Sequence, residues 1–239
     1  MTTLVIGAGG TIGRACALRI AQNGEVIALD LKAPQLPGLV GRALDVTDFN
    51  AVNSILHSIE DEGEITGLVY AAGLNTTGPL DTLDWRDYER VMAVNLRGAF
   101  HFGSAILALL RKKPRRFASV FISSTAGLVG EAGGSIYCAS KFGLIGFTQS
   151  FAGEIAAFGG RANVVCPGNV DSPMLRELAD RIGAREGCSG EEVLNQWQRS
   201  SALGRLLTPD EVAQSCAWLL SDEASGVTGQ TIVVDGPRA

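Results

Sequence analysis

The sequence has little of what metal sites, disulfide frameworks and membrane spans require. Its two histidines, His57 and His101, lie far apart and lack the short spacing of metal ligands. The five cysteines are scattered, odd in number and without a CxxC pair, which predicts reduced thiols and neither disulfides nor a zinc site. No apolar run approaches the roughly 18 residues of a membrane-spanning helix. We therefore expect neither a metal site nor a membrane span.

The sequence also has few charged residues, and the basic ones are the fewer. Charged residues make up 19% of the chain and its formal net charge is −5. An acidic chain without a long basic stripe is a poor binder of nucleic acids and anionic membranes. The one basic cluster, residues 111–116, separates an apolar helical run from an apolar strand-like run, which favours a solvated loop over a docking patch for an acidic partner. The first residues lack the features of a signal peptide, so a cytoplasmic location is expected.

Short apolar runs alternate with longer segments of helical period. This alternation predicts an α/β fold, a doubly wound parallel sheet of about seven strands with helices on both faces. Six strands are expected from the apolar runs at residues 4–6, 26–29, 68–70, 120–122, 164–165 and 232–234. The sequence contains no linker or repeat, and its length suits one domain over residues 1–239.

Local signals mark where helices begin and where the chain is irregular. Thr208-Pro209-Asp210-Glu211 has a capping residue, a proline at the first helical position and a glutamate at the third. Asp84 is expected to cap a helix that runs through Asn95. Residues 31–41 hold two prolines and two glycines, so a loop or one short turn is expected there. The polar, glycine-containing stretch at about 171–204 predicts a helical insertion or mobile lid over a substrate.

A glycine-rich turn at residues 7–13 follows the first expected strand and opens a helix. Glycines there let the backbone approach a pyrophosphate closely, and a helix N-terminus favours an anion. Asp30 ends the next strand, where a carboxylate fits the hydroxyls of an adenosine ribose and repels an added phosphate. The pattern favours NAD over NADP, although Lys32 lies nearby. A plain glycine turn and a plain turn aspartate are the alternatives.

Tyr137 and Lys141 lie four residues apart and share one face if their segment is helical. An ammonium beside a phenol stabilises the phenolate and lowers its pKa toward neutrality, which makes the phenol a usable general acid or base. Ser124 ends the strand just before, and Asn95 lies in a helix that precedes that strand. We predict that these four residues form a catalytic set.

In their order and distances these motifs resemble the short-chain dehydrogenase/reductase family, classical type, over almost the whole chain. Ser124 lies thirteen residues before Tyr137, as the catalytic serine of that family does. The resemblance implies a single-domain Rossmann fold that binds NAD. It implies these cofactor-binding residues: Gly7, Gly10, Thr11, Ile12, Gly13, Asp30, Asp45, Val46, Ala72, Gly73, Tyr137, Lys141, Pro167, Gly168 and Val170. The end of the chain, Val233-Val234-Asp235-Gly236, resembles the family's C-terminal strand motif.

The resemblance also implies a mechanism and an assembly. Ser124 would hydrogen-bond the substrate oxygen, and Tyr137 would transfer the hydroxyl proton. Lys141 would lower the pKa of the tyrosine and hold the nicotinamide ribose, while Asn95 would anchor a water in the proton relay. Hydride would pass between the carbinol carbon and NAD, so the expected function is an oxidoreductase for a secondary alcohol or carbonyl. Relatives are usually tetramers, sometimes dimers, so a homotetramer or dimer is expected.

The sequence departs from the family pattern at two places. Thr11 replaces the middle glycine of the cofactor motif, which gives the spacing of the extended subfamily, although the chain has no room for the extra substrate domain of those proteins. An epimerase of the extended type is therefore disfavoured. Tyr70-Ala71 stands where the family has two asparagines, so the hydrogen bonds at that strand end are expected to differ.

The substrate remains open between 3-oxoacyl thioesters and cyclic alcohols such as dihydrodiol acids. Residues 131–136 are expected to line the substrate pocket. Three arginines, Arg176, Arg181 and Arg185, either reach an anionic substrate group or decorate an exposed helix. A non-catalytic NAD(H)-binding sensor or scaffold protein is the alternative function.

Overall fold

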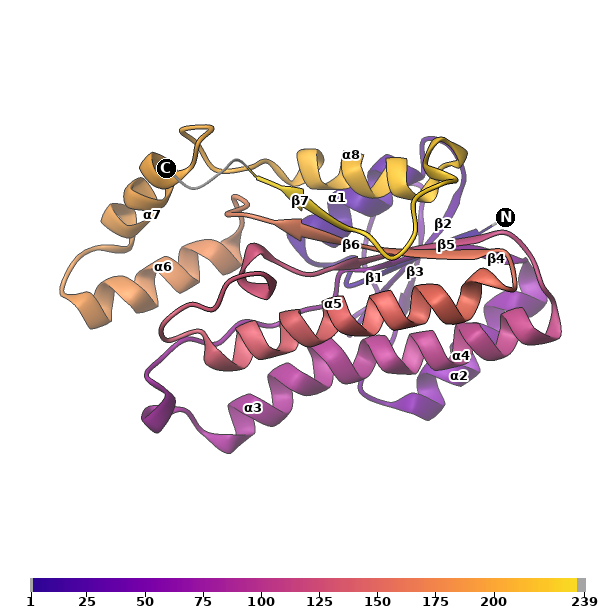
Figure 1. The fold of residues 1–239 in the computed structure, drawn as a ribbon, viewed down its shortest axis with the longest axis horizontal. Helices are drawn as coiled ribbons and strands as arrows, with labels where there is room; N and C mark the ends of the chain where they lie inside the picture. Colours follow the sequence, from indigo (N-terminus) through magenta and orange to yellow (C-terminus); the bar gives the residue numbers. More distant parts are fainter. Residues whose placement is uncertain (1, 236–239) are drawn as a thin grey trace.

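The computed structural model describes residues 2–235, in which a seven-stranded sheet is covered by helices on both faces (Figure 1). All strand pairs are parallel, in the order β3-β2-β1-β4-β5-β6-β7. The strands are β1 (Thr2–Ile6), β2 (Glu25–Asp30), β3 (Val40–Ala43), β4 (Ile65–Tyr70), β5 (Phe117–Ile122), β6 (Gly160–Pro167) and β7 (Thr231–Val234). The predicted doubly wound α/β fold is confirmed. The apolar runs did not mark β3, because this short edge strand has no buried residue.

Two helical layers bury the sheet on both sides. On one face lie α1 (Thr11–Ile20) and α8 (Pro209–Leu220), and on the other lie α2 (Phe49–Glu62), α4 (Gly98–Lys112) and α5 (Ser135–Ala156) (Figure 1). Along β1, Leu4 and Ile6 belong to the core beneath α2, α4 and α5, whereas Val5 belongs to the core beneath α1 and α8. This double burial explains why the strands appear in the sequence as continuous apolar runs.

The predicted helix starts are present. The Asp84 side chain accepts a hydrogen bond from the Arg86 amide at the start of α3 (Trp85–Met92). At α8 the Thr208 side chain and Glu211 form a capping box. Helix α3 continues through a π-helical turn, η2 (Ala93–Arg97), into α4. By length and composition this run, residues 85–112, could span a membrane, but half of it is buried inside the fold, as in a core helix.

The chain between β2 and β3 has no helix, as predicted from its prolines and glycines. The predicted helical insertion consists of α6 (Pro173–Glu186) and α7 (Gly190–Ser200), which project beyond the carboxyl ends of the strands (Figure 1). Ser172 caps α6, and Gly187 ends it in the left-handed conformation with φ of 78°. The proposed movement of this segment as a lid stays a prediction.

Ion pairs occupy much of the basic cluster at residues 111–116. Arg115 pairs with Glu60 at 2.8 Å in a largely buried contact, Lys113 pairs with Glu64, and Arg116 pairs with Asp222. These ion pairs connect the loop before β5 to α2, to the residues after α2 and to the short turn after α8. They favour the interpretation of the cluster as a solvated loop over that of a docking patch.

Candidate active site

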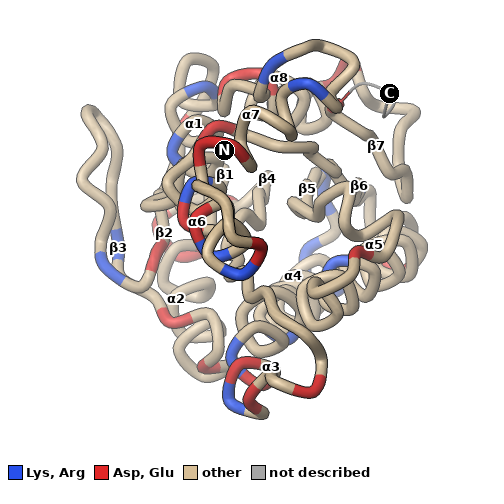
Figure 2. The backbone as a smooth tube through the Cα atoms, turned by 90° about the vertical axis from the view of Figure 1, so that its left-hand side faces the viewer, with Lys and Arg blue, Asp and Glu red and all other residues tan. Residues whose placement is uncertain are grey.

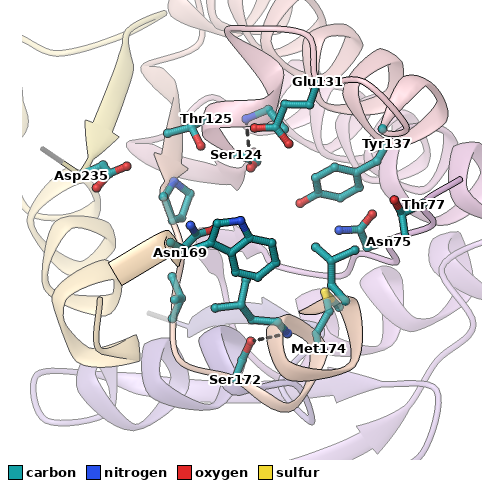
Figure 3. A pocket seen from close by; sticks show the side chains of 18 of the residues that line it. Asn75, Thr77, Ser124, Thr125, Glu131, Tyr137, Asn169, Ser172, Met174 and Asp235 are labelled. Carbon is teal, nitrogen blue, oxygen red and sulfur yellow. Dashed lines mark hydrogen bonds between the residues drawn. The ribbon is translucent and has the colours of Figure 1, made fainter. Parts of the chain in front are cut away.

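A cavity of about 490 Å³ lies at the carboxyl ends of β4, β5 and β6, beneath α6 and α7 (Figure 3). In a parallel sheet the loops that follow the strands meet at this edge, where ligands bind. The cavity is lined by the loop after β4, the residues after β5, the start of α5, the loop after β6 and the inner faces of α6 and α7. The strand order reverses between β1 and β4, beside this cavity.

Ser124 and Tyr137 meet at the cavity wall. Ser124 lies two residues after the end of β5, and its hydroxyl accepts a 3.2 Å hydrogen bond from the Ala126 amide and also hydrogen-bonds Tyr137. Tyr137 lies in the first turn of α5, and Figure 3 shows its hydroxyl pointing into the cavity. The structure therefore places the predicted serine and tyrosine side by side, open to a substrate.

Lys141 lies one helical turn after Tyr137, with its Nζ 5.6 Å from the centre of the tyrosine ring. The Nζ donates a 2.8 Å hydrogen bond to the Ile122 carbonyl at the end of β5. Burial lowers the pKa of Lys141 to about 8. The ammonium is thus held at the strand end, close to the phenol without a direct hydrogen bond to it.

The expected lowering of the Tyr137 pKa is wrong for the protein alone. Burial raises the pKa of Tyr137 to about 12, and the hydrogen bond with Ser124 offsets only part of this effect. The negative charge of Glu131 raises this pKa further. Loss of solvation therefore outweighs the nearby lysine, whose own charged form burial disfavours.

Asn95 is fully buried in the π-helical turn and connects three elements. Its Oδ1 accepts a 2.7 Å hydrogen bond from the Leu74 amide, and its Nδ2 donates to the Leu74 carbonyl at 2.9 Å. The Nδ2 also donates to the Ser140 hydroxyl on α5 at 3.0 Å. Asn95 thereby fastens the loop after β4 to the helix that carries Tyr137. Its predicted role as a water anchor stays a prediction.

The glycine turn fits a dinucleotide. Gly7 adopts a φ of +80°, and a side chain there would collide with the backbone of Ala72, two residues after the end of β4. Gly13 lets α1 pack closely against the turn, because a Cβ atom at this position would overlap the Gly7 carbonyl. The N-cap of α1 is Gly10, and no side chain caps this helix. The first amides of α1 are therefore suited to hold a pyrophosphate.

Asp30 lies at the tip of β2, beside the glycine turn. Its two carboxylate oxygens accept hydrogen bonds from the Gly9 amide at 2.9 Å and the Leu31 amide at 2.7 Å. Each oxygen keeps a further lone pair, which suits the two hydroxyls of a ribose. The geometry is thus compatible with the predicted recognition of adenosine.

The other predicted cofactor residues lie along the same edge of the sheet. Asp45 accepts hydrogen bonds from the amide and hydroxyl of Thr47, and Val46 is buried next to it. Ala72 and Gly73 follow β4. Ile12, Pro167, Gly168 and Val170 line the cavity. The Asp235 carboxylate packs against Gly168, so a side chain at this position would have to displace it. Gly236 lies outside the described residues.

The three arginines of α6 differ in their surroundings. Arg176 pairs with Asp171 at 2.7 Å and Arg181 pairs with Glu177 at 2.6 Å, and Figure 2 shows both signs of charge along this helix. These two arginines decorate an exposed surface. Arg185 reaches the pocket rim, where it hydrogen-bonds the Thr77 hydroxyl at 3.5 Å.

Residues 131–136 were predicted to line the pocket, and Glu131, Ala132 and Gly134 do line the cavity. Four further residues line the cavity and were not predicted: Asn75, Thr77, Asn169 and Trp197. Asn75 and Thr77 could have been predicted, because they follow a parallel strand and ligands bind at the carboxyl ends of such strands. Trp197 falls within the predicted lid segment, but only the packing of α7 shows that its side chain lines the cavity. Within residues 2–235, no cluster of three or more His, Cys, Asp or Glu side chains is placed to hold a metal ion.

Comparisons with known proteins agree with this geometry. A family model described as enoyl-(acyl carrier protein) reductase matches residues 7–236. The 3-oxoacyl-[acyl-carrier-protein] reductase of Thermotoga maritima is 35% identical over 246 residues, which cover 98% of this chain and 95% of that protein. Two solved structures also match over the chain. NAD⁺-bound xylitol dehydrogenase has a TM-score of 0.89 and 27% identity, covering 98% of this chain and 97% of its own. Actinorhodin polyketide ketoreductase with NADPH has a TM-score of 0.89 and 30% identity, with 98% and 95% covered.

Proposed function

The chain belongs to the short-chain dehydrogenase/reductase family and is an oxidoreductase that acts on secondary alcohols or the corresponding ketones, and we propose that it uses NAD(H) with Tyr137 as its acid/base. The observation that carries the proposal is that Ser124 and Tyr137 line one cavity together with Ile12 of the glycine turn. This arrangement puts a proton donor where a carbonyl oxygen and a nicotinamide can meet.

In the proposed mechanism the protein orients the substrate and moves one proton. Ser124 hydrogen-bonds the substrate oxygen next to the Tyr137 hydroxyl. Tyr137 gives its proton to that oxygen in reduction and takes it back in oxidation. Lys141, held at the Ile122 carbonyl, stabilises the phenolate by its charge. A nicotinamide dinucleotide bound at the glycine turn supplies the chemistry of hydride transfer.

The preference for NAD over NADP rests on Asp30. Its carboxylate lies at the tip of β2 beside the amide of Gly9. A 2′-phosphate on the adenosine ribose would approach this negative charge, and like charges in contact cost several kcal/mol. Structural neighbours of the chain include both an NAD⁺ and an NADPH complex, so the argument depends on this residue alone.

The substrate is a 3-oxoacyl thioester or a cyclic alcohol of the dihydrodiol type in this proposal. The names of similar proteins cover acyl-chain reduction as well as polyol oxidation, as in 3-oxoacyl-[acyl-carrier-protein] reductase and xylitol dehydrogenase. The segment 171–204 would act as the lid that selects between them. A non-catalytic sensor is disfavoured because the proteins to which this chain is similar are named as reductases and dehydrogenases.

We further propose a homotetramer, or a dimer, in the cytoplasm. Several large side chains on α3, α4 and α5 are exposed in the single chain, among them Trp85, Phe100 and Phe142. An exposed apolar face of this kind suits contact with a second copy. Light scattering during size-exclusion chromatography measures the assembly, and a monomer at micromolar concentration would contradict it.

The test of the proposed function is a turnover assay with NADH and NADPH against ketones and secondary alcohols. Tyr137→Phe is expected to keep NADH binding, measured by protein-to-NADH fluorescence transfer, and to lose turnover. Tyr88→Phe, on the exposed surface of α3, is the matched control and is expected to keep both. Full activity of Tyr137→Phe would refute the assigned role, and NADH binding without any turnover would favour the sensor.

A further inference from the structure

The segment between β3 and α2, residues 44–48, lies beside the proposed cofactor site. The Leu44 amide donates a 2.7 Å hydrogen bond to the carbonyl of Asp30, whose carboxylate is predicted to bind the adenosine ribose. The strand order puts β3 on one side of β2 and the glycine turn after β1 on the other. A dinucleotide that runs from the cavity past the glycine turn to Asp30 therefore has its adenine end next to this segment.

Asp45 and Val46 bring an unused acceptor and an unused donor to this edge of the sheet. The amide and the hydroxyl of Thr47 both donate to the Oδ1 atom of Asp45. Within residues 2–235, no group hydrogen-bonds the Oδ2 atom of Asp45 or the amide of Val46. Adenine carries an amino donor close to ring-nitrogen acceptors, so one edge of the base can meet this pair. The segment therefore fits the base of the predicted cofactor.

His101 on α4 holds this segment from outside. Its Nδ1 lies 2.9 Å from the carbonyl oxygen of Val46. Because a carbonyl oxygen only accepts, Nδ1 carries the hydrogen and donates it. Among the described residues, this is the one hydrogen bond that a residue outside 44–48 makes to residues 45–47. The orientation of the Val46 peptide groups thus depends on a side chain 55 positions away in the sequence.

The imidazole ring of His101 is itself kept in place by Phe49. The two rings are 5.3 Å apart between centres and tilted by 58°. Phe49 is the first residue of α2, directly after Asp48, whose side chain caps that helix. Helices α2 and α4 pack against each other on one face of the sheet (Figure 1). His101 therefore connects α4 both to the segment and to the helix that follows it.

We propose that His101 is a positioning residue for the adenosine half of the cofactor, because its hydrogen bond to the Val46 carbonyl fixes the peptide groups that face the base. The inference rests on the proposed function, since it takes a nicotinamide dinucleotide as the cofactor. His101 is not among the residues that line the cavity with Ser124 and Tyr137. Loss of its hydrogen bond should therefore weaken cofactor binding and leave the reaction itself unchanged.

Two variants of His101 separate the hydrogen bond from the bulk of the ring. His101→Leu removes the donor and keeps an apolar side chain beside Phe49. His101→Asn keeps a donor, because the Nδ2 atom of asparagine can take the place of the histidine Nδ1. His57→Leu is the matched control, since the Nδ1 of His57 also hydrogen-bonds a backbone carbonyl, that of Asn53 at 2.8 Å, on the exposed surface of α2.

Calorimetric titration measures the Kd of ADP-ribose, which is the cofactor without its nicotinamide, and steady-state kinetics give kcat and both KM values. We expect His101→Leu to raise the Kd of ADP-ribose and the KM for NADH roughly 3- to 10-fold, the effect of losing one neutral hydrogen bond. The kcat at saturating NADH and the KM for the ketone should change by less than about twofold. His101→Asn should recover most of the affinity, and His57→Leu should match the unmodified protein.

Two results would overturn the inference and leave the proposed function intact. One is an unchanged Kd of ADP-ribose in His101→Leu. The other is a loss of affinity that His101→Asn does not recover and that comes with an equal fall in kcat, because the histidine would then support the fold as a whole. Absence of both NADH binding and turnover in the unmodified protein, with NADPH equally inactive, would instead remove the proposed function and the inference with it.

Discussion

The Tyr70 hydroxyl donates a 2.6 Å hydrogen bond to the carbonyl of Val94, inside the π-helical turn that carries Asn95. Tyr70 is the last residue of β4 and is fully buried. Its ring packs against Phe102 on α4 and Phe121 on β5, with ring centres 5.8 and 6.0 Å away. The sheet therefore holds the turn in place through the Tyr70 phenol.

Tyr70→Phe should loosen this turn. The ring contacts remain, and only the hydrogen bond to Val94 is lost, so we expect the free energy of unfolding to fall by about 1 kcal/mol. The kcat should also fall, by less than in Asn95→Ala, because Asn95 still holds Leu74 and Ser140. Urea unfolding and steady-state kinetics measure the two effects. Tyr88→Phe is the control, since the Tyr88 hydroxyl makes no hydrogen bond within the described part of the chain. Equal losses in both variants would contradict this role of Tyr70.

The sequence predicted the sheet well, because parallel strands buried on both faces form apolar runs that need no knowledge of their partners. It also marked Ser124, Tyr137 and Lys141, whose spacing along β5 and α5 is local. The edge strand β3 escaped because exposed residues carry no such signal. The Tyr70 contact with Val94 escaped as well, since these residues are 24 positions apart and meet only after folding.

The pKa of Tyr137 was predicted in the wrong direction for a related reason. Sequence spacing correctly put a lysine one turn away, but it contains no measure of how far burial disfavours a phenolate. Burial also disfavours the charged form of Lys141, whose Nζ donates a hydrogen bond to the Ile122 carbonyl. The balance of solvation and charge in a site emerges only from packing around it.

Asp30→Asn should shift cofactor preference toward NADPH. Asparagine keeps an acceptor for the Gly9 or Leu31 amide and removes the negative charge that would oppose a 2′-phosphate. We expect the ratio of kcat/KM for NADPH to that for NADH to rise at least about tenfold. Asp61→Asn, an exposed change on α2, should leave the ratio unaltered. A constant ratio in Asp30→Asn would show that another group discriminates between the cofactors.

Thiol reactivity should separate Cys188 from the other four cysteines. Cys188 is exposed, whereas Cys16, Cys138, Cys166 and Cys216 are buried. Burial also raises the pKa of Cys166, and contact with Cys16 together with burial raises that of Cys216, so thiolate formation is disfavoured at both. An aromatic disulfide reagent should label one thiol quickly in the native protein and all five after unfolding.

Cys188→Ser should remove the fast phase of that reaction and leave the slow one. A native mass lower by two hydrogens, with only three thiols titrated after unfolding, would instead reveal a disulfide. The adjacent pair Cys16 and Cys216, between α1 and α8, would be its place. Such a result would contradict the prediction of reduced thiols.

Lys141 should make stability depend on alkaline pH. Its pKa is about 8 in the folded protein, below its usual value of 10.5, because burial disfavours the ammonium. Between these values the unfolded chain binds more protons than the folded one, so stability rises with pH through this window. Below it, the charged lysine in the buried site costs stability relative to the unfolded chain.

Comparison with Lys141→Met isolates this effect, because methionine fills similar space and does not titrate. The free energy of unfolding of the unmodified protein, relative to the variant, should rise by up to about 3 kcal/mol across the window, the equivalent of the pKa difference. Urea unfolding at several pH values from neutral to moderately alkaline measures it. Lys112→Met, at the exposed end of α4, should show a constant difference. If Lys141→Met also shows a constant difference, the ammonium is solvated or paired in the folded protein. Its charge would then be fully present at neutral pH, where it would stabilise the Tyr137 phenolate more strongly than this geometry implies.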